Sequence, residues 1–521
     1  MRIFILFITI LFHATTLSQI SKPKMVIAIV VDQMKYEYIY RFWDDFSEKG
    51  FKKLIDEGTF CRNTHYNYVP TYTGPGHASI FTGTTPAVHG IIGNSWYSRD
   101  SLNPVYCAGD WKAQTICLCQ KPHDQLNKGD GKMSPRNLLS TTIGDQLKIV
   151  DTLSKVFGVS LKDRGSILST GFSADGAYWM NSTGNWITSD YYRNFIPNWV
   201  KQFEEFNSVS SYMNGFWTGS TFNINLKDKL DQRGPSAIKS SPKGNKILWD
   251  FSKQLILNES LGVDEHTDLL VMGFSATDYI GHQFGPDAEQ TKDTYIKLDQ
   301  TISDMLLFFD KQFGKKNYTI MLTSDHGAAT SPDVLKKMKF NGGRFDSRKL
   351  LLELNRYLFD VFGQDQLVSK EINMQFYLNF DIINLAGIEF DLLFQKIKHF
   401  LESKEFIKSV YDLRSNSFFV NENEIKMIKN GFHPKRSGDV FYVLSPGYIE
   451  WSRETGTTHA SHYNYDTHVP LVFYGRGVQK KKLIDKRVHI SDIAPTLSII
   501  MKSSFPSGCT GNPIEGVILK N

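Results

Sequence analysis

Three short apolar runs, each ending directly at polar residues, constrain most strongly what this chain can fold into. The runs occupy residues 25–31, 269–274 and 319–322. Runs of this length without alternating polar residues suit strands buried on both faces, as in a parallel sheet covered by helices. Amphipathic helical patterns lie between them, for example in residues 294–313. The sequence therefore predicts an α/β fold with a large, mostly parallel central sheet flanked by helices.

The length of the chain leaves room for a large core. With 521 residues, 41% of them hydrophobic and 13% aromatic, it can bury one large α/β domain or two ordinary ones. Residues 97–146 and 341–431 carry fewer of the strand-then-polar units, and we interpret them as insertions. We expect a single catalytic domain in residues 19–521.

The N-terminus has the pattern of a secretory signal peptide. Residues 1–18 contain one early cation, an apolar run over 3–12 and small residues near their end. The alternative is a buried first helix or strand. No other segment approaches a transmembrane length. We expect an exported protein, periplasmic or extracellular, with no stable membrane span after signal cleavage. A monomer is favoured, although the sequence leaves the oligomeric state open.

The charge of the chain argues against one class of partner. The formal net charge is +5, and Lys and Arg are spread among acidic residues rather than gathered in blocks. Nucleic-acid binding has no electrostatic support, so we expect no nucleic acid partner.

Five cysteines follow the predicted cleavage point, where oxidation is permitted. The odd number leaves at least one of them unpaired within the chain. Cys107, Cys117 and Cys119 lie close together, and no histidine lies within that span. A local disulfide is therefore a better interpretation than a metal knuckle, while the pairing stays open.

Carboxylates and imidazoles follow the predicted strands, and ligands gather at the carboxyl ends of such strands. The candidate metal ligands are Asp32, Asp278, His282, Asp325, His326 and His459. Oxygen and nitrogen ligands without thiolate suit Zn²⁺, or less well Mn²⁺ or Fe. Six ligands are too many for one open catalytic zinc ion, so two metals are the economical interpretation.

Each ligand has a structural alternative. A lone Asp after a strand, such as Asp32, is more often a helix N-cap or a turn former. Asp325 and His326 could form a structural hydrogen bond. Asp278 and His282 share one face if they lie on a helix, although Gly281 makes a loop turn equally possible.

The order of these residues resembles the alkaline phosphatase superfamily. Within it, the chain is similar to the secreted, phosphate-insensitive bacterial alkaline phosphatases that use threonine as nucleophile. The similarity runs from residue 25 to the chain end. The motifs that carry it are VPTYTGPGHASIFTG, GIIGNSW, SLKDRGSIL, DTHVPLVFYG and DIAPTL. Nucleotide pyrophosphatase/phosphodiesterases are similar in the metal motifs and the threonine.

The resemblance implies that Thr73 is the nucleophile and a metal ligand. A threonine hydroxyl attacks phosphorus poorly at neutral pH, and metal coordination lowers its pKa. Thr71 offers the same chemistry, and Thr73 is preferred because Asn94 follows it at the distance the family shows. The resemblance further assigns the metal ligands. It implies that one zinc ion, beside Thr73, is held by Asp32, Asp325 and His326, and the other by Asp278, His282 and His459.

Selectivity for monoesters rests on two cations. In the resembling phosphatases, the residues matching Lys162, Arg164 and Asn94 contact the phosphoryl oxygens. If the SLKDR segment is extended, Lys162 and Arg164 point the same way. The alternative is a solvated basic patch at a strand end.

Other histidines compete for these roles. His462 or His468 could replace His459 as the third imidazole, and His468 could instead serve packing. We expect His77 and His89 to be structural, because nothing in the local pattern gives them a partner.

The prediction is an exported two-zinc alkaline phosphatase that hydrolyses small phosphate monoesters through a phosphothreonine intermediate and releases inorganic phosphate. A phosphodiesterase is the main alternative. The diesterase relatives lack the cationic pair, so the two functions are distinguished by whether Lys162 and Arg164 matter. A sulfatase would need a Cys/Ser-x-Pro-x-Arg motif, and Thr73 stands at that position without one. An exported binding protein with structural zinc would not need an open hydroxyl.

Overall fold

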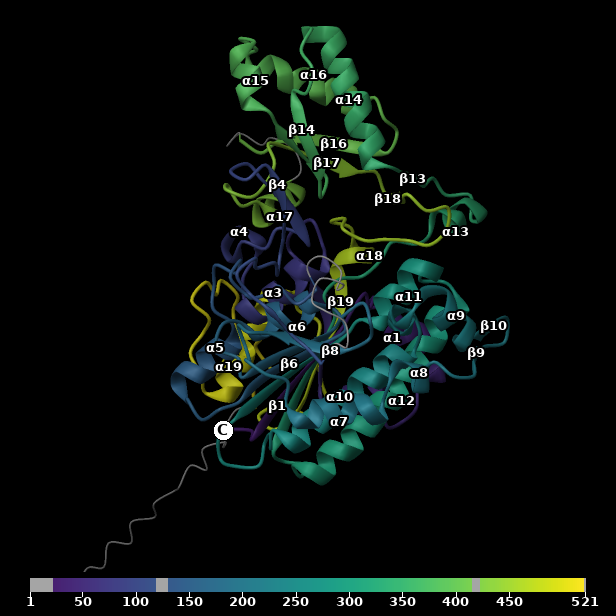
Figure 1. The fold of residues 1–521 in the computed structure, drawn as a ribbon, viewed down its shortest axis with the longest axis vertical. Coiled ribbons are helices and arrows are strands. Elements are labelled where there is room, and N and C mark those ends of the chain that lie inside the picture. The colour runs from purple at the N-terminus through teal and green to yellow at the C-terminus, as the bar shows by residue number, and fades with distance from the viewer. Residues whose placement is uncertain (1–21, 119–129, 415–421, 520–521) are drawn as a thin grey trace, which may run out of the picture.

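A computed structural model describes residues 22–118, 130–414 and 422–519. The predicted signal peptide and Cys119 lie outside these residues. The predicted α/β fold is confirmed, with one large sheet of 11 strands at its centre (Figure 1). Its strands, in spatial order, are β20 (Lys482–Ile484), β2 (Thr59–His65), β19 (His468–Gly475), β12 (Tyr318–Thr323), β1 (Met25–Val31), β11 (Asp268–Phe274), β6 (Val156–Ser160), β7 (Gly176–Met180), β8 (Trp186–Ser189) and β5 (Thr115–Ile116), with β21 (Val488–His489) beside β2.

The middle of this sheet is parallel. Strands β12, β1, β11, β6 and β7 run in one direction, while β19 and β8 pair antiparallel at its two sides. The three apolar runs are the three central strands, β12, β1 and β11. In their register, Val31 lies opposite Phe274 and Val30 lies opposite Thr323. The three strands therefore end at one edge of the sheet.

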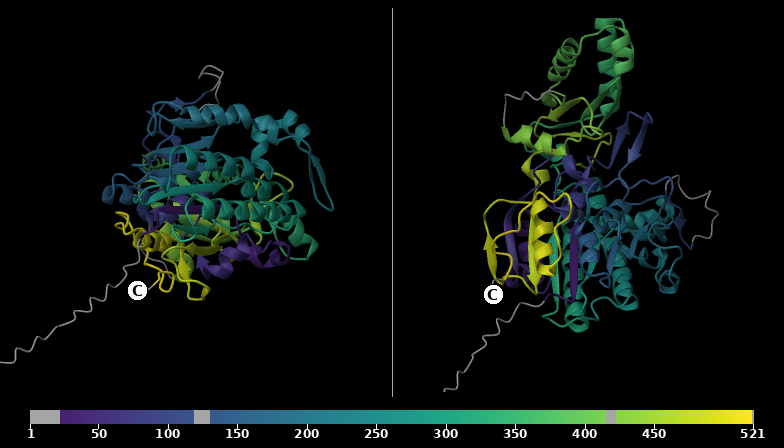
Figure 2. Two further views of the ribbon diagram at one scale, coloured as in Figure 1. Left: turned by 90° about the horizontal axis from the view of Figure 1, so that it is seen from below. Right: turned by 90° about the vertical axis from the view of Figure 1, so that its left-hand side faces the viewer.

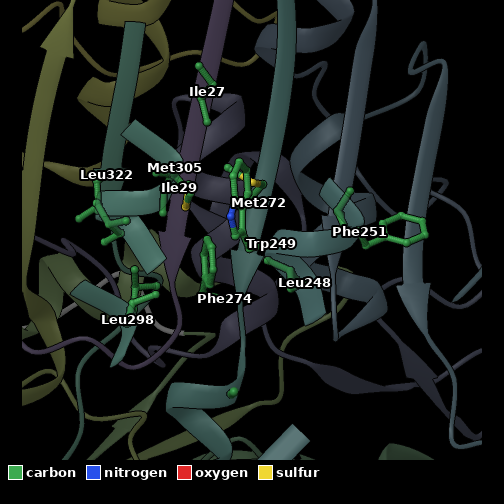
Figure 3. Close-up of a cluster of buried hydrophobic side chains, with 14 of the residues drawn as sticks. Ile27, Ile29, Leu248, Trp249, Phe251, Met272, Phe274, Leu298, Met305 and Leu322 are labelled. Atoms are coloured by element: carbon green, nitrogen blue, oxygen red, sulfur yellow. The ribbon is translucent and has the colours of Figure 1, made fainter. Parts of the chain in front are cut away.

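Strand β1 serves two hydrophobic cores because its side chains alternate between the faces of the sheet. Ile27 and Ile29 belong to one cluster, and Val26, Ala28 and Val30 belong to another. This explains why the run is apolar throughout instead of alternating. Figure 3 shows the first cluster, where side chains of β1, β11 and β12 meet those of two long helices.

Helices cover both faces of the sheet (Figure 1). The first face carries α1 (Tyr38–Arg41), α2 (Phe51–Glu57), α7 (Asn198–Phe206), α8 (Val209–Tyr212), α9 (Leu226–Arg233), α10 (Lys243–Asn258), α11 (Ala276–Phe284) and α12 (Glu289–Gln312). The second carries α3 (Thr73–Thr82), α5 (Ile143–Val150), α6 (Asp163–Thr170) and α19 (Ile493–Met501), with α4 (Pro86–His89) beside α3. The pattern in residues 294–313 lies almost wholly within α12.

A smaller unit, which we call the cap, stands at one end of the sheet (Figure 1 and the right panel of Figure 2). It has its own hydrophobic core. Its elements are α14 (Ser347–Phe362), β14 (Val368–Ile372), β15 (Gln375–Leu378), α15 (Phe380–Leu385), α16 (Phe390–Glu402), β16 (Ile407–Asp412), α17 (Glu422–Gly431) and β17 (Val440–Leu444). Residues 341–431, interpreted from the sequence as an insertion, supply most of the cap, and β17 extends it beyond that range.

Short paired strands complete the structure. The pairs are β3 (Ser95–Ser98) with β4 (Asn103–Tyr106), β9 (Phe216–Thr218) with β10 (Asn223–Asn225), and β13 (Gly343–Phe345) with β18 (Tyr448–Glu450). The short helices α13 (Pro332–Lys337) and α18 (Asn464–Thr467) precede β13 and β19. Within the described residues, no helix combines the length and hydrophobicity that crossing a membrane requires.

Three of the cysteines, Cys61, Cys107 and Cys509, are free thiols, and Cys117 is in a disulfide. Cys107 therefore takes no part in a local disulfide of the kind predicted for its neighbourhood. It is fully buried below the loop that carries Asn94, whose carbonyl oxygen accepts a hydrogen bond from the Cys107 N–H.

Candidate active site

The shared edge of the central strands brings together side chains that are far apart in the sequence. Asp32 follows β1 directly, and Asp325 follows β12 after one residue. Strand β11 leads into α11, which carries Asp278 and His282 one turn apart. The helical alternative for this pair is the one observed. Because parallel strands end together, these polar groups meet at one place.

Three imidazoles at this edge are held in the same way. In each ring, Nδ1 donates to a backbone carbonyl oxygen at 2.7–2.9 Å: His282 to Thr457, His326 to Gly327 and His459 to Thr71. A carbonyl oxygen can only accept, so the neutral ring keeps its lone pair on Nε2. Burial lowers the pKa of His326 to about 4 and that of His459 well below its ordinary value.

These lone pairs face carboxylate oxygens, which are also acceptors. His326 Nε2 lies 3.5 Å from Asp32 Oδ1 and 3.6 Å from Asp325 Oδ2. Both oxygens are buried and have no hydrogen-bond partner. Buried acceptors without donors are costly, and a cation would satisfy all three at once. The donor set therefore fits a metal ion.

A second set of possible ligands converges on Asp278, whose charge outweighs burial and raises the pKa of His282. Its Oδ1 lies 3.1 Å from His282 Nε2 and 3.8 Å from His459 Nε2. These three residues form one group that could hold a metal, and Asp32, Asp278 and His326 form another. The rings of His326 and His459 stack with centroids 3.4 Å apart, so the two groups adjoin.

This arrangement differs in one respect from the ligand sets that the resemblance implied. Asp278 belongs to both groups of the structure, and Asp325 Oδ2 lies 3.6 Å from His326 of the group formed with Asp32. Lys162 lies between two of these acids, with Nζ 2.6 Å from one oxygen of Asp32 and 2.6 Å from one of Asp278. One ammonium group therefore pairs with both carboxylates.

Burial and the neighbouring charges shift the pKa values of the three acids. Burial, followed by repulsion from Asp278 and Asp325, raises the pKa of Asp32 to about 8. Burial also raises the pKa of Asp325, to about 7. Burial acts on Asp278 in the same direction, but His282 and Lys162 outweigh it and hold its pKa well below the ordinary value. The acids need positive charge close by in order to ionise together.

Thr73 lies at the start of helix α3 and faces this cluster. Its Oγ1 is 3.4 Å from His326 Nε2 and 3.5 Å from Lys162 Nζ. Asn94 Oδ1 accepts from the N–H of Gly74 at 2.8 Å, which places the asparagine against the same helical turn. An N-terminal helical turn presents free N–H groups and favours anions. Thr71 instead donates to a backbone carbonyl oxygen 3.0 Å away.

Lys162 and Arg164 are not on an extended segment. Strand β6 ends at Ser160, and Lys162 is the N-cap of α6, so the two residues point from a strand-to-helix turn. The Lys162 side chain is only 2% exposed and paired with acids, which contradicts a solvated patch. Arg164 donates to the hydroxyl of Tyr106 at 3.1 Å. Both cations line a cavity beside the metal-binding groups.

The comparisons with known proteins agree with this geometry. The family model for type I phosphodiesterase / nucleotide pyrophosphatase matches residues 26–468. The chain belongs to this family. The predicted alkaline phosphatase superfamily is thereby confirmed.

Relatives of this phosphodiesterase-family chain cover nearly its whole length. It is 38% identical to a protein named calcium-transporting ATPase from Myroides odoratus, over 96% of this chain and 95% of the relative. It is 35% identical to alkaline phosphatase PafA from Elizabethkingia meningoseptica, with the same coverage. A crystal structure of PafA superposes with a TM-score of 0.90, covering 96% of this chain and 100% of that one.

Three other histidines considered from the sequence of this family member, His462, His468 and His89, have partners elsewhere. His462 Nε2 is 3.1 Å from Glu424, which belongs to the cap. His468 stacks on Tyr36 and on His65, so it serves packing. His89 hydrogen-bonds with a serine of α3 at 2.9 Å.

Two residues at the site were missed from the sequence. His77, predicted to lack a partner, hydrogen-bonds with Ser169 at 2.9 Å and lies 3.7 Å from Asp325 Oδ2. Its position four residues after Thr73 on a helix was the available signal. Gln33 donates through Nε2 to Asp278 Oδ1 at 2.7 Å. Nothing in the sequence pattern marks that contact, because the two residues are 245 positions apart.

Proposed function

We propose that this enzyme is an exported two-zinc alkaline phosphatase that acts through a covalent phosphothreonine. The chain is a phosphoric monoester hydrolase of the alkaline phosphatase superfamily, in line with the 35% identity to PafA over nearly the whole chain. The observation that carries the proposal is the convergence of unpartnered carboxylate oxygens and imidazole lone pairs beside the Thr73 hydroxyl. A binding protein with structural metal would not need that hydroxyl.

The proposed ligand sets follow the family pattern. Asp32, Asp325 and His326 would hold the ion beside Thr73, and the other set is Asp278, His282 and His459. Zinc bound there lowers the pKa of a coordinated hydroxyl and stabilises charge on the leaving oxygen.

The protein's own residues then have distinct tasks. Thr73 Oγ1 forms the bond to phosphorus while the bond from phosphorus to the leaving oxygen breaks, and the leaving oxygen takes up a proton. The first N–H groups of α3, with Asn94, Lys162 and Arg164, hold the non-bridging oxygens. A water molecule then attacks the phosphothreonine, which restores the hydroxyl and releases inorganic phosphate.

Monoester selectivity is proposed from charge. A monoester carries two negative charges and three non-bridging oxygens, so cationic donors favour it over a diester. Lys162 Nζ reaches within 3.5 Å of Thr73 Oγ1, which supports a place for this cation at the reacting phosphorus. The description of the matching family model favours a phosphodiesterase as the second candidate.

One experiment separates the two candidates. The ratio of kcat/KM for an aryl phosphate monoester to that for the matching diester is measured for the native enzyme and for Lys162→Ala with Arg164→Ala. A strong monoester preference that collapses in the double variant supports the phosphatase. A diester preference that the substitutions leave unchanged would refute it. Mass spectrometry of an acid-quenched reaction should find phosphate on Thr73.

Export is proposed from the signal pattern in residues 1–18. N-terminal sequencing of the protein recovered outside the cytoplasm should begin near residue 19. A protein retained with residues 1–18 intact would contradict export.

A further inference from the structure

A cavity of about 520 Å³ opens beside the reaction centre. Its wall includes Lys162, Tyr279 and His282, so it is continuous with the site. His282 belongs to the group with Asp278 and His459, whereas Thr73 Oγ1 lies 3.4 Å from His326 of the other group. In an in-line displacement the leaving group departs opposite the attacking oxygen. The cavity therefore lies on the side where the leaving group departs.

The cavity is lined by an excess of positive charge. Two carboxylates, Asp130 and Asp163, are outnumbered by the cations Lys162, Arg164, Arg233, Lys239 and Arg453. Among the described residues, only Lys162 of these cations has an ion pair. Asp163 accepts from the hydroxyl of Tyr106, and Asp130 accepts from Ser182 at 2.8 Å. The hydrogen bonds of these acids come from neutral donors, and their two negative charges offset only part of the positive charge of the lining.

Lys239 contributes one of these positive charges. Its Nζ donates to the carbonyl oxygen of Met180 at 2.8 Å, and an ammonium group has two further donors. Burial lowers the pKa of Lys239 to about 8, because attraction to Asp163 and Asp130, opposed by repulsion from Arg164 and Lys162, does not offset it. Arg164 also has a buried Nε with no hydrogen-bond partner. Buried cationic donors without acceptors are unfavourable unless an anion binds them.

Part of the cavity wall is aromatic. Trp451 stacks on His282 with centroids 5.2 Å apart and an angle of 9° between the rings. The guanidinium of Arg453 lies 5.3 Å from the Trp451 ring centroid. Trp179 also lines the cavity. A leaving group here meets flat apolar surface with cations around it.

We propose that this cavity binds a second phosphate carried by the leaving group, held by Lys239 and Arg453. The inference rests on the proposed phosphatase function and names its substrate class, organic esters that carry two phosphates. The transferred phosphate moves to Thr73 as before, and the leaving oxygen takes up a proton. The second phosphate stays intact and serves only for binding.

Two substrates that differ only in this group test the inference. Propane-1,3-diyl bisphosphate carries a second phosphate, and 3-hydroxypropyl phosphate does not. The native enzyme should have a higher kcat/KM for the bisphosphate. Lys239→Met and Arg453→Ala should each lower that value about tenfold, mainly through KM, because each removes a charge-assisted contact to phosphate. Neither should change the value for the monophosphate more than about twofold.

The controls separate binding from folding. Arg453 is exposed, so its removal leaves the core intact, and thermal unfolding checks Lys239→Met. Lys398→Met, a cap substitution of the same chemistry, should leave both substrates unaffected.

Two results would overturn the inference. Equal efficiency of the native enzyme on both substrates would do so, as would equal losses on both substrates in the variants. In either case hydrolysis of the monophosphate would leave the phosphatase function standing. An enzyme that hydrolyses neither these esters nor an aryl phosphate would refute both proposals.

Discussion

Gln33 offers a sharp test of how the metal-binding groups are built. It follows Asp32 directly and takes a left-handed backbone conformation, with φ of 64°. Its N–H donates to Asp325 Oδ1 at 3.1 Å, and its Nε2 donates to Asp278 Oδ1 at 2.7 Å. One residue therefore orients a carboxylate in each of the two proposed ligand sets.

The substitution Gln33→Met removes the side-chain donor and keeps the length of the side chain. A hydrogen bond to a charged acceptor contributes about 1.5–3 kcal/mol, which corresponds to roughly 10- to 150-fold in an equilibrium constant. Substitution of a residue that hydrogen-bonds to a metal ligand typically lowers metal affinity about 10- to 100-fold. We expect zinc affinity to fall about 10- to 100-fold, while the backbone contact to Asp325 remains.

The assay is competition for zinc between the metal-depleted protein and a chromophoric chelator, which reports affinity independently of turnover. Gln146→Met is the matched control, because this buried glutamine of α5 donates to Thr141, a neutral group, at 2.9 Å. An affinity unchanged within about twofold, in a variant that unfolds at the native temperature, would refute the positioning role of Gln33.

The remaining predictions concern stability, packing and metal. Burial and repulsion from Glu450 raise the pKa of Glu371 to about 7. Between pH of about 4.5 and 7 the folded state therefore binds more protons than the unfolded state. The free energy of unfolding falls as pH rises through that window. Urea denaturation should show that Glu371→Gln removes a pH dependence of about 3 kcal/mol, and an unchanged slope would contradict this. Gly76→Ala places a methyl group 2.4 Å from the Asp325 carbonyl oxygen. We expect kinetics to show at least about tenfold lower kcat/KM, and unfolding to show about 1–3 kcal/mol lower stability. Native-like values would contradict the close packing. Chelation should abolish activity, Zn²⁺ should restore it, and full recovery with Mg²⁺ alone would count against zinc.

Local sequence patterns predicted the central sheet and the candidate residues. The runs at 25–31, 269–274 and 319–322 needed no partner to be recognised, because a strand buried on both faces must be apolar throughout. Their polar endings then followed from the general rule that ligands gather at the carboxyl ends of parallel strands. The order of the motifs indicated the family, and the resemblance to that family led to the choice of Thr73 as the predicted nucleophile.

The tertiary structure decided everything that depends on contacts between distant segments. The position of Lys162 between Asp32 and Asp278 depends on the pairing of β6 with β11 and of β11 with β1, which no local pattern specifies. The partners of His77 and the charged surroundings of Lys239 arise in the same way. The secondary-structure preference of a segment depends on residues close in the sequence, whereas the electrostatic surroundings of a side chain exist only after the chain has folded.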